Sequence, residues 1–356
     1  MMKIDNFGAG PCILPPSVFE QASQAVLDFN DSGLSILEIS HRSEAFLEIM
    51  ATAQNLALEH LNLQNKGYRA LFLHGGASLQ FLMVAYNLLE KKAAYLNTGT
   101  WSQKAIKEAR AFGEVIEIGS SENRGFNYIP TNYTIPKDVD FFHCTSNNTI
   151  YGTQINHFPT TEVPVVCDMS SDIFSRVLDF TQFDLIYAGV QKNMGPAGAA
   201  LVVIKEEILG KVSRHIPSML NYQIHISKDS IYNTAPVFPI YVSMLTLKWL
   251  KEKGGVSAIE KINNKKADLL YSEIDRNPLF KGYVEHKKDR SVMNATFNLM
   301  DENRETRFSQ LCKEAGISGV KGHRSVGGYR ASIYNALPVE SVEILVEVMQ
   351  ELERKY

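Results

Sequence analysis

The chain has 356 residues, of which 45% are hydrophobic, and it carries 36 Lys and Arg against 39 Asp and Glu. This length suggests about two domains, and the apolar content excludes an intrinsically disordered chain. The formal net charge of -3 gives no signal for a nucleic-acid partner, and no apolar run reaches the ~20 residues that a membrane helix needs.

The cysteines and the first residues bear on the cellular compartment. Cys12, Cys144, Cys167 and Cys312 are far apart and form no CxxC pair. Such spacing favours a reducing compartment over a disulfide framework or a zinc site. The segment Met1–Asn6 lacks the apolar stretch of a signal peptide. We therefore expect a cytoplasmic protein with no nucleic-acid and no membrane partner.

Short apolar runs alternate with helical stretches from about residue 68 to about residue 205. The strand-length runs are Arg69–His74, Ala93–Asn97, Glu114–Ile118, Val139–Cys144, Val163–Asp168, Asp184–Val190 and Ala199–Ile204. Between them, Ser78–Glu90 and Ser102–Ala111 have the spacing of amphipathic helices. This alternation predicts an α/β fold with a mostly parallel sheet covered on both faces.

The pattern changes after about residue 235. Two long helices are expected there, Val237–Glu252 and Ala258–Asn277. A smaller unit follows, with strands Met293–Leu299 and Arg330–Tyr334 and helices Arg304–Ala315 and Val339–Lys355. We predict a large domain over residues 16–255 and a small C-terminal domain over residues 256–356, to which we assign residues 1–15, a segment with little helical pattern.

A glycine-containing turn, His74-Gly75-Gly76-Ala77-Ser78-Leu79-Gln80, follows the first predicted strand and precedes a helix. Glycines let the backbone approach a ligand closely, and a helix N-terminus offers free N–H groups to an anion. The turn is neither a dinucleotide fingerprint nor a Walker loop. On this segment alone, a phosphate cradle and an ordinary strand-to-helix turn both remain open.

Arginines occur in two further polar segments, His41-Arg42-Ser43 and the stretch from Gly322 to Arg330. The planar guanidinium group binds a carboxylate or a phosphate through two parallel hydrogen bonds. A single arginine is more often a solvated surface group. In the second segment, however, His323, Arg324 and Arg330 fall within eight residues beside three glycines, which favours an anion site.

A lysine and an aspartate each stand at the end of a predicted strand. Lys192 comes just after Asp184–Val190, and Asp168 ends the run Val163–Asp168. Both side chains should lie at the carboxyl edge of the sheet, where open α/β sheets bind ligands. Burial would lower the pKa of the lysine and leave a nucleophilic amine. The pair suits pyridoxal phosphate, which forms a Schiff base with a lysine and needs a carboxylate against its pyridine nitrogen.

Two more residues after apolar runs suit the same cofactor. Trp101 could stack on the ring, and Thr149 could contact the ring hydroxyl. Each residue alone has an ordinary structural explanation: a core aromatic for Trp101, a helix N-cap for Asp168, an exposed turn lysine for Lys192. The chain order of glycine turn, aromatic, threonine, aspartate and lysine nevertheless favours a cofactor site.

With these motifs the sequence resembles the phosphoserine aminotransferases, in the class V, fold-type I group of pyridoxal-phosphate enzymes. The segments that carry the resemblance are Asn6–Pro11, His41–Ser43, His74–Ser78, Thr98–Ser102, Asp168–Ser171, Tyr187–Asn193, Tyr232–Thr234 and Gly322–Gly328. The resemblance implies a large domain with a mostly parallel seven-stranded sheet between helices, and a smaller α/β C-terminal domain.

The resemblance also implies roles for individual residues. Lys192 would be the Schiff-base lysine and the base that moves the α-proton. The implied cofactor ligands are Ala77, Ser78, Trp101, Thr149, Asp168, Gln191 and Lys192, with Asn233 and Thr234 reaching the cofactor phosphate from the neighbouring subunit of a homodimer. Arg330 would bind the substrate α-carboxylate, and Arg42, His323 and Arg324 would bind a distal anion. No metal is implied.

The family reaction follows from this resemblance. Glutamate would donate its amino group, and 3-phosphohydroxypyruvate would become phosphoserine in serine biosynthesis, by ping-pong transamination through the Lys192 Schiff base. The phosphorylated hydroxythreonine of vitamin B6 biosynthesis would be a second substrate, since it carries the same two anions.

Three other functions remain as alternatives. The first is another class V enzyme, such as an alanine–glyoxylate aminotransferase or a cysteine desulfurase, although Cys312 on a predicted helix looks structural. The second is a non-catalytic ligand-binding relative, which the intact Lys192 and Asp168 disfavour. The third is a nicotinamide dehydrogenase, for which the glycine fingerprint is missing.

Overall fold

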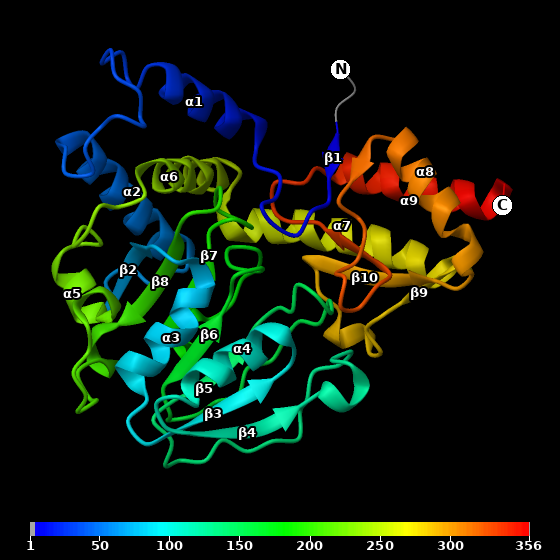
Figure 1. Cartoon of the computed structure of the whole chain (residues 1–356). Helices are drawn as coiled ribbons and strands as arrows, with labels where there is room; N and C mark the ends of the chain where they lie inside the picture. Colours follow the sequence, from blue (N-terminus) through cyan, green and yellow to red (C-terminus); the bar gives the residue numbers. More distant parts are fainter. Residues whose placement is uncertain (1–3, 356) are drawn as a thin grey trace.

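A seven-stranded sheet forms the centre of the computed structural model, which describes residues 4–355 (Figure 1). The spatial order of its strands is β2 (Tyr68–Leu73), β8 (Ala200–Lys205), β7 (Leu185–Gly189), β6 (Val165–Asp168), β5 (Phe142–Thr145), β3 (Lys92–Asn97) and β4 (Glu114–Ser120). Strand β8 is antiparallel to both β2 and β7, whereas the pairs from β7 to β4 are parallel. The predicted mostly parallel seven-stranded α/β fold is therefore confirmed.

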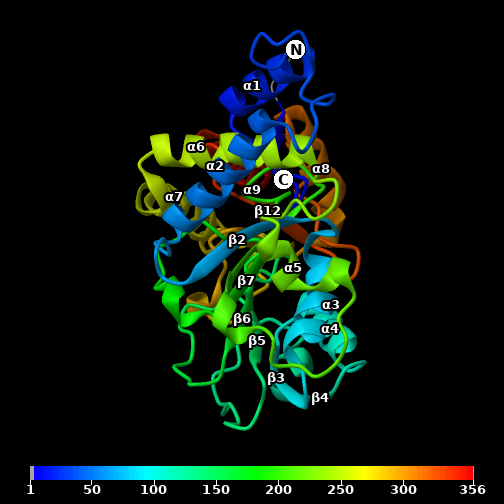
Figure 2. The same cartoon turned by 90° about the vertical axis from the view of Figure 1, so that its left-hand side faces the viewer.

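Helices cover both faces of this sheet, because neighbouring residues of a strand point to opposite sides. Leu71 packs into the cluster on one face and Phe72 into the cluster on the other. The first face carries α3 (Gly76–Leu88), α4 (Thr100–Ala109) and α5 (Tyr222–Ser227). The second carries α2 (Glu44–His60) and α6 (Val237–Glu252), and α1 (Pro16–Leu27) packs on α6. Figures 1 and 2 show α3 and α4 on the side of the sheet away from α2 and α6.

A second, smaller sheet lies beside the first (Figure 1). Its strands are antiparallel, in the order β12 (Tyr329–Ser332), β10 (Asn294–Leu299) and β9 (Phe280–Gly282). Three helices pack with this sheet: α7 (Gly255–Arg276), α8 (Glu305–Glu314) and α9 (Val339–Lys355). The short strand β1 (Asp5–Asn6) pairs in parallel with β11 (Ile317–Ser318), and the fully buried Phe7 belongs to the same core. The N-terminal strand thus packs on the C-terminal unit.

The division into residues 16–255 and 256–356 with 1–15 remains a prediction. Separate hydrophobic clusters around the large sheet and around α9 favour it. Val256 and Ile259 of α7, however, pack into the cluster of the large sheet. Residues 1–3 and 356, which the prediction assigns to the small domain, lie outside the described residues.

Most predicted strands agree with the structure to within two residues, and the clearest difference is at β5. The prediction began it at Val139, but the strand begins at Phe142. The Asp140 carboxylate accepts hydrogen bonds from the backbone N–H groups of Glu90, Lys91 and Lys92, which holds this part of the chain in a turn. Within residues 4–355, no helix is long and apolar enough to cross a membrane.

Candidate active site

A cavity of about 390 Å³ opens at the carboxyl ends of the parallel strands. Of the residues predicted for the cofactor, the cavity is lined by Ala77, Ser78, Trp101, Thr149, Asp168, Gln191 and Lys192. They come from the segments that follow β2, β3, β5, β6 and β7. The fold therefore brings together seven side chains that are spread over more than a hundred positions of sequence, at the edge where α/β sheets bind ligands.

The turn into α3 forms one wall of this cavity. Gly75 has φ +83°, and a Cβ atom there would lie 2.5 Å from the Cβ of Leu79. Only glycine fits this turn without strain. Helix α3 begins at the next residue, so its first backbone N–H groups have no carbonyl partner within the helix. Together with the Ser78 side chain, they can bind an anion such as a phosphate.

Lys192 lies inside the cavity with few polar neighbours. Its Nζ donates a hydrogen bond to Thr149 Oγ1 at 2.8 Å and lies 6.0 Å from the centre of the Trp101 ring. Burial lowers the pKa of Lys192 to about 8, although the Asp168 carboxylate acts in the opposite direction. A large fraction of this amine is therefore neutral under mildly alkaline conditions, as a nucleophile requires.

Asp168 is a buried carboxylate, with only 4% of its surface exposed. Its Oδ1 accepts hydrogen bonds from the backbone N–H of Ser170 at 2.9 Å and from the Ser170 hydroxyl at 2.6 Å. No residue of the described part of the chain donates to Oδ2. Burial raises the pKa of Asp168, while Ser170 and the Lys192 charge lower it. A cationic group bound next to Oδ2 would keep this side chain ionised.

A buried ion pair, Asp172 with Arg176, holds together two loops that line the cavity. The Asp172 carboxylate accepts hydrogen bonds from Arg176 at 2.9 Å and from Gln154 at 3.2 Å, and it also contacts the Ser146 hydroxyl. These contacts tie the loop after β5, which carries Thr149, to the loop after β6. Sequence analysis missed the pair, although the i,i+4 spacing of Asp172 and Arg176 was a signal.

An amide pair joins the cavity to the small sheet. Asn147 lines the cavity, and its Nδ2 donates to Ser171 Oγ and to Asn294 Oδ1, both at 2.8 Å. Asn294 Nδ2 in turn donates to Ser332 Oγ at 3.0 Å and to Tyr334 Oη at 3.2 Å. All of these groups are buried. The network fixes strand β12, and with it Arg330, relative to the cavity.

Arg330 lies beside the lysine. Its Nη1 donates to the Thr149 carbonyl at 3.2 Å, and its charge contributes to the lowered pKa of Lys192. Burial lowers the pKa of Arg330 itself. Its Nε is buried and has no hydrogen-bond partner among residues 4–355. A guanidinium group with an unused donor next to the cavity can bind a carboxylate.

The loop before β12 carries the other predicted cations. Gly322 N–H donates to the Gly328 carbonyl at 2.8 Å, which closes the loop, and His323 Nδ1 lies 2.7 Å from Ser325 Oγ. The pKa of His323 is lowered, mainly by burial and then by the positive charges of Arg330, Arg324 and Lys104. Several cations therefore gather around His323.

Besides Arg330, His323 and Arg324, three more predicted ligands are absent from the cavity lining. Arg42 is exposed on the connection between α1 and α2, and Asn233 and Thr234 lie in the segment before α6. The Thr234 carbonyl is 2.7 Å from His74 Nε2. Their assigned roles stay predictions, and those of Asn233 and Thr234 involve a neighbouring copy of the chain.

Two cysteines bear on the desulfurase alternative. Cys12, to which sequence analysis gave no role, donates its thiol hydrogen to the Lys192 carbonyl. Cys312 is buried in α8. Burial raises the pKa of each thiol to about 12. Neither has the thiolate character that a nucleophilic cysteine needs.

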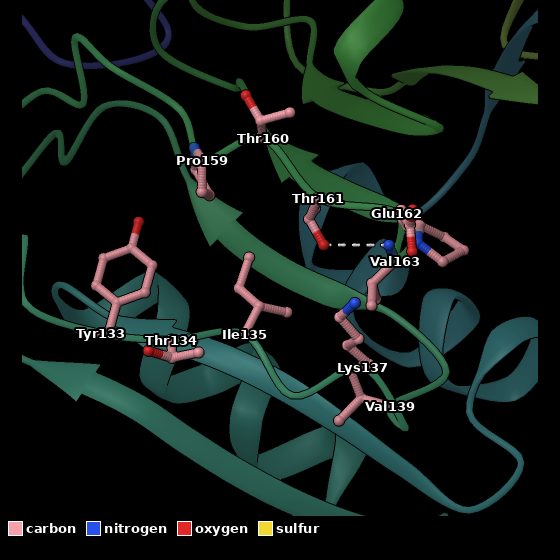
Figure 3. A pocket seen from close by; sticks show the side chains of 11 residues that line it. Tyr133, Thr134, Ile135, Lys137, Val139, Pro159, Thr160, Thr161, Glu162 and Val163 are labelled. Carbon is pink, nitrogen blue, oxygen red and sulfur yellow. Dashed lines mark hydrogen bonds between the residues drawn. The ribbon is translucent and has the colours of Figure 1, made fainter.

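A larger hollow of about 750 Å³ lies away from these groups (Figure 3). It is lined by segments that precede β5 and β6, including Ile135, Val139 and Pro159. It therefore lies at the amino ends of these strands, opposite the edge that carries Lys192. In Figure 3, Thr161 accepts a hydrogen bond from the Val163 backbone at 3.1 Å. The larger volume does not make this hollow the active site, because the reactive side chains Lys192 and Asp168 line the smaller cavity.

The residues of that cavity fit pyridoxal phosphate. Lys192 supplies an amine for its aldehyde, Asp168 Oδ2 is available to a protonated ring nitrogen, and the start of α3 suits its phosphate. The Nε1 of Trp101 is buried without a partner within the described chain, so this ring has a free donor as well as a flat face. The cofactor would supply an electron-poor ring that stabilises negative charge at the substrate α-carbon.

The fold and this donor set define the class: a pyridoxal-phosphate-dependent transaminase of fold type I. Residues 4–345 match the family model described as aminotransferase class-V. The chain belongs to that family.

Three similar proteins agree with this classification. A phosphoserine aminotransferase from Flavobacterium psychrophilum is 66% identical, over 99% of this chain and 100% of its own length. A solved phosphoserine aminotransferase, studied for radiation damage of its Schiff base, superposes with a TM-score of 0.95 at 44% identity and covers 100% of both chains. The phosphoserine aminotransferase from Trichomonas vaginalis with pyridoxal phosphate bound has a TM-score of 0.92 at 33% identity, covering 98% of this chain and 100% of its own.

Proposed function

We propose that this aminotransferase transfers the amino group of glutamate to 3-phosphohydroxypyruvate, forming phosphoserine and 2-oxoglutarate in serine biosynthesis. One observation carries the proposal: Arg330 donates a hydrogen bond to the carbonyl of Thr149, which lines the cavity with Lys192 and Asp168, and the charges of Arg330 and Arg324 both act on His323 of the loop before β12. The names of the similar proteins support the same activity.

Both substrates of this reaction carry an α-carboxylate and a second anion several bonds away. We assign the α-carboxylate to Arg330, whose guanidinium has an unpartnered Nε among the described residues. His323 and Arg324 would bind the distal carboxylate of glutamate or the phosphate of the other substrate. One pair of anion sites then serves both halves of a ping-pong reaction.

In this proposal the residues of the cavity hold the reacting groups and move one proton. Lys192 binds the cofactor aldehyde covalently and, once released, takes the proton from the substrate α-carbon. Thr149, which accepts the hydrogen bond of Lys192 Nζ, keeps the amine directed to that position. Trp101 covers the ring and excludes water, and Asp168 keeps the ring nitrogen protonated. Ala77, Ser78 and Gln191 contact the cofactor phosphate.

We also propose a homodimer with shared active sites. Residues 16–47, here called the N-terminal arm, project from the body of the molecule (Figures 1 and 2). The arm carries exposed apolar side chains, among them Phe19 at 53%, Leu27 at 76% and Leu37 at 63% exposure. Exposed apolar groups of this density favour an interface. In such a dimer, Arg42, Asn233 and Thr234 would complete the site of the partner.

Two finer assignments belong to the same proposal. The phosphorylated hydroxythreonine of vitamin B6 biosynthesis would be a second substrate, because it presents the same pair of anions. A cytoplasmic location is supported by the cysteines, all four of which are free thiols.

An amino-transfer assay with 2-oxoglutarate as acceptor tests the substrate. Phosphoserine should be a far better amino donor than serine or alanine. The variant Arg330→Ala should lose activity with every donor, whereas Arg324→Ala should lose it mainly with phosphoserine and glutamate, by the ~1.5–3 kcal/mol of a charge-assisted hydrogen bond. Equal turnover of alanine and phosphoserine would overturn the proposed specificity.

A further inference from the structure

Lys104 lies close to the active site and has no assigned role. It is in α4, three residues after Trp101, so both side chains lie on the same side of the helix. Its Nζ is 4.6 Å from the centre of the Trp101 ring, the ring that lines the cavity. Among residues 4–355, no carboxylate pairs with Lys104 and no hydrogen bond is made by its ammonium group. Its charge is therefore available to another anion.

Lys104 is also close enough to the loop before β12 to act on it. Together with Arg330 and Arg324, its charge disfavours the protonated form of His323. Lys104 thus lies against a ring that lines the cavity, and its charge reaches His323 on the neighbouring loop. Trp101 lies next to it, with a buried Nε1–H that has no partner in the described chain.

We propose that Lys104 is a specificity-determining residue, which together with His323 and Arg324 favours a substrate with a distal phosphate over one with a distal carboxylate. This inference rests on the proposed function and names one more group of the same site. The positive charges repel one another when no anion is present, and a bound anion relieves that repulsion. Phosphate carries about -1.5 to -2 charges near pH 7 against -1 for a carboxylate, so a further cation stabilises it more.

The type of residue agrees with this role. Lysine is a compact point charge on a flexible stem, whereas arginine binds through a fixed planar fork. Resting on the face of Trp101, the Lys104 ammonium is held near the cavity mouth by the ring itself. It can follow a phosphate or a carboxylate at slightly different positions, which suits a site that has to accept both substrates in turn.

The test compares Lys104→Gln with Lys107→Gln in the cofactor-loaded protein. Lys107 is an exposed lysine in the same helix and makes no ring contact among the described residues. The Lys104→Gln variant should show about a fivefold higher KM for phosphoserine. This change corresponds to the upper range of the free energies of exposed ion pairs. Its KM for glutamate should rise less and its KM for alanine by less than twofold, while Lys104→Arg should restore most of the phosphoserine affinity. Lys107→Gln should behave like the wild type.

A second readout does not depend on which amino acid is the natural donor. Inorganic phosphate should inhibit transfer from glutamate competitively, with an inhibition constant about fivefold higher in Lys104→Gln than in Lys107→Gln. Equal inhibition constants in the two variants, or equal KM changes for phosphoserine and alanine, would overturn the role of Lys104. Failure of the wild type to use phosphoserine, with the phosphate effect intact, would instead overturn the proposed function and leave a phosphate-selective Lys104.

Discussion

Lys192 and Asp168 depend on each other as well as on burial. Burial disfavours the charge of both side chains, and each partly restores the charge of the other. Ser170 holds one oxygen of the carboxylate with two hydrogen bonds and leaves the other available. The result is a nucleophilic amine and a carboxylate that a cation stabilises, at one edge of one sheet.

Replacing Asp168 with asparagine should therefore impair the chemistry more than the fold. An amide cannot keep a ring nitrogen protonated, so kcat should fall about 10- to 100-fold, corresponding to the ~1.5–3 kcal/mol of a hydrogen bond to a charged group. Steady-state kinetics of Asp168→Asn, with circular dichroism to verify folding, measures this. The control is Asp184→Asn, because Asp184 bonds Lys205 and the backbone N–H of Val165 at the opposite edge of the sheet. Equal kcat losses in the two variants would contradict the assignment.

The lowered pKa of Lys192 predicts a pH dependence for cofactor-free protein. Only the neutral amine attacks an aldehyde, and the neutral fraction increases as pH rises through the pKa of about 8. The rate of pyridoxal phosphate uptake, followed by visible absorbance, should thus increase from pH 7 to pH 9 and level off above. A rate that keeps increasing up to about pH 10.5, the ordinary lysine value, would show that the amine is not desolvated.

Site residues that come at the end of a strand or just after one could be predicted from the sequence. Residues that matter because of a contact with a distant part of the chain could not. Lys192, Asp168, Trp101 and Thr149 each follow a recognisable apolar run. Asn294, by contrast, matters because it meets Asn147 across 147 positions of sequence, and no local pattern marks that contact.

At the scale of elements, the loop before β12 depends on close backbone packing. A Cβ atom on Gly322 would lie 2.0 Å from the Gly327 carbonyl oxygen, so the loop can close only with glycine there. The same loop carries His323 and Arg324. Its geometry thus determines the positions of His323 and Arg324, the cations of the proposed distal-anion site.

Substituting Gly322 with alanine should displace this loop. The strain of about 1–3 kcal/mol typical of overpacking should appear mainly as a raised KM for phosphoserine, with a much smaller change for alanine. Thermal unfolding should shift by a few degrees at most, because the loop is partly exposed. An unchanged KM for phosphoserine in Gly322→Ala would show that the loop does not position these cations.

Some helices were predicted closely from their local pattern, whereas others were missed, including α2, whose Ser43 N-cap was a signal in the sequence. The helices Val237–Glu252 and Val339–Lys355 agree with the structure at both ends. Helices α1 and α2 were not predicted. Helix α1 has no side-chain N-cap and exposes Phe19, so its start signal is weak and one apolar residue lies off its buried face. In the proposed dimer, another copy of the chain would cover this apolar surface.

At the scale of the whole molecule, the proposed dimer makes one cavity depend on two chains. Arg42 is exposed on the N-terminal arm, outside the cavity of its own chain. Light scattering should give twice the mass of the chain. Glutamate substitutions at Leu27 and Leu37, both on the arm, should convert the protein to monomers with little activity. A wild-type monomer with full activity would refute shared sites.

A mixing experiment identifies the subunit that supplies Arg42. Lys192→Ala and Arg42→Ala should each be impaired with phosphoserine. When the two variants are dissociated and reassembled together, half of the random dimers contain one subunit of each variant. In such a dimer, the subunit that keeps Lys192 receives Arg42 from its partner, so one of the two sites is intact. About a quarter of wild-type activity should therefore return. No recovery would mean that Arg42 serves the cavity of its own chain.

We expect Lys192 to hold the cofactor covalently at the cavity that it shares with Asp168. Borohydride reduction of the cofactor-loaded protein, followed by peptide mass spectrometry, should therefore give a pyridoxyl adduct on the peptide that contains Lys192 and none in Lys192→Ala. An adduct on Lys104 or Lys205 in place of Lys192, or no adduct on any lysine, would contradict it.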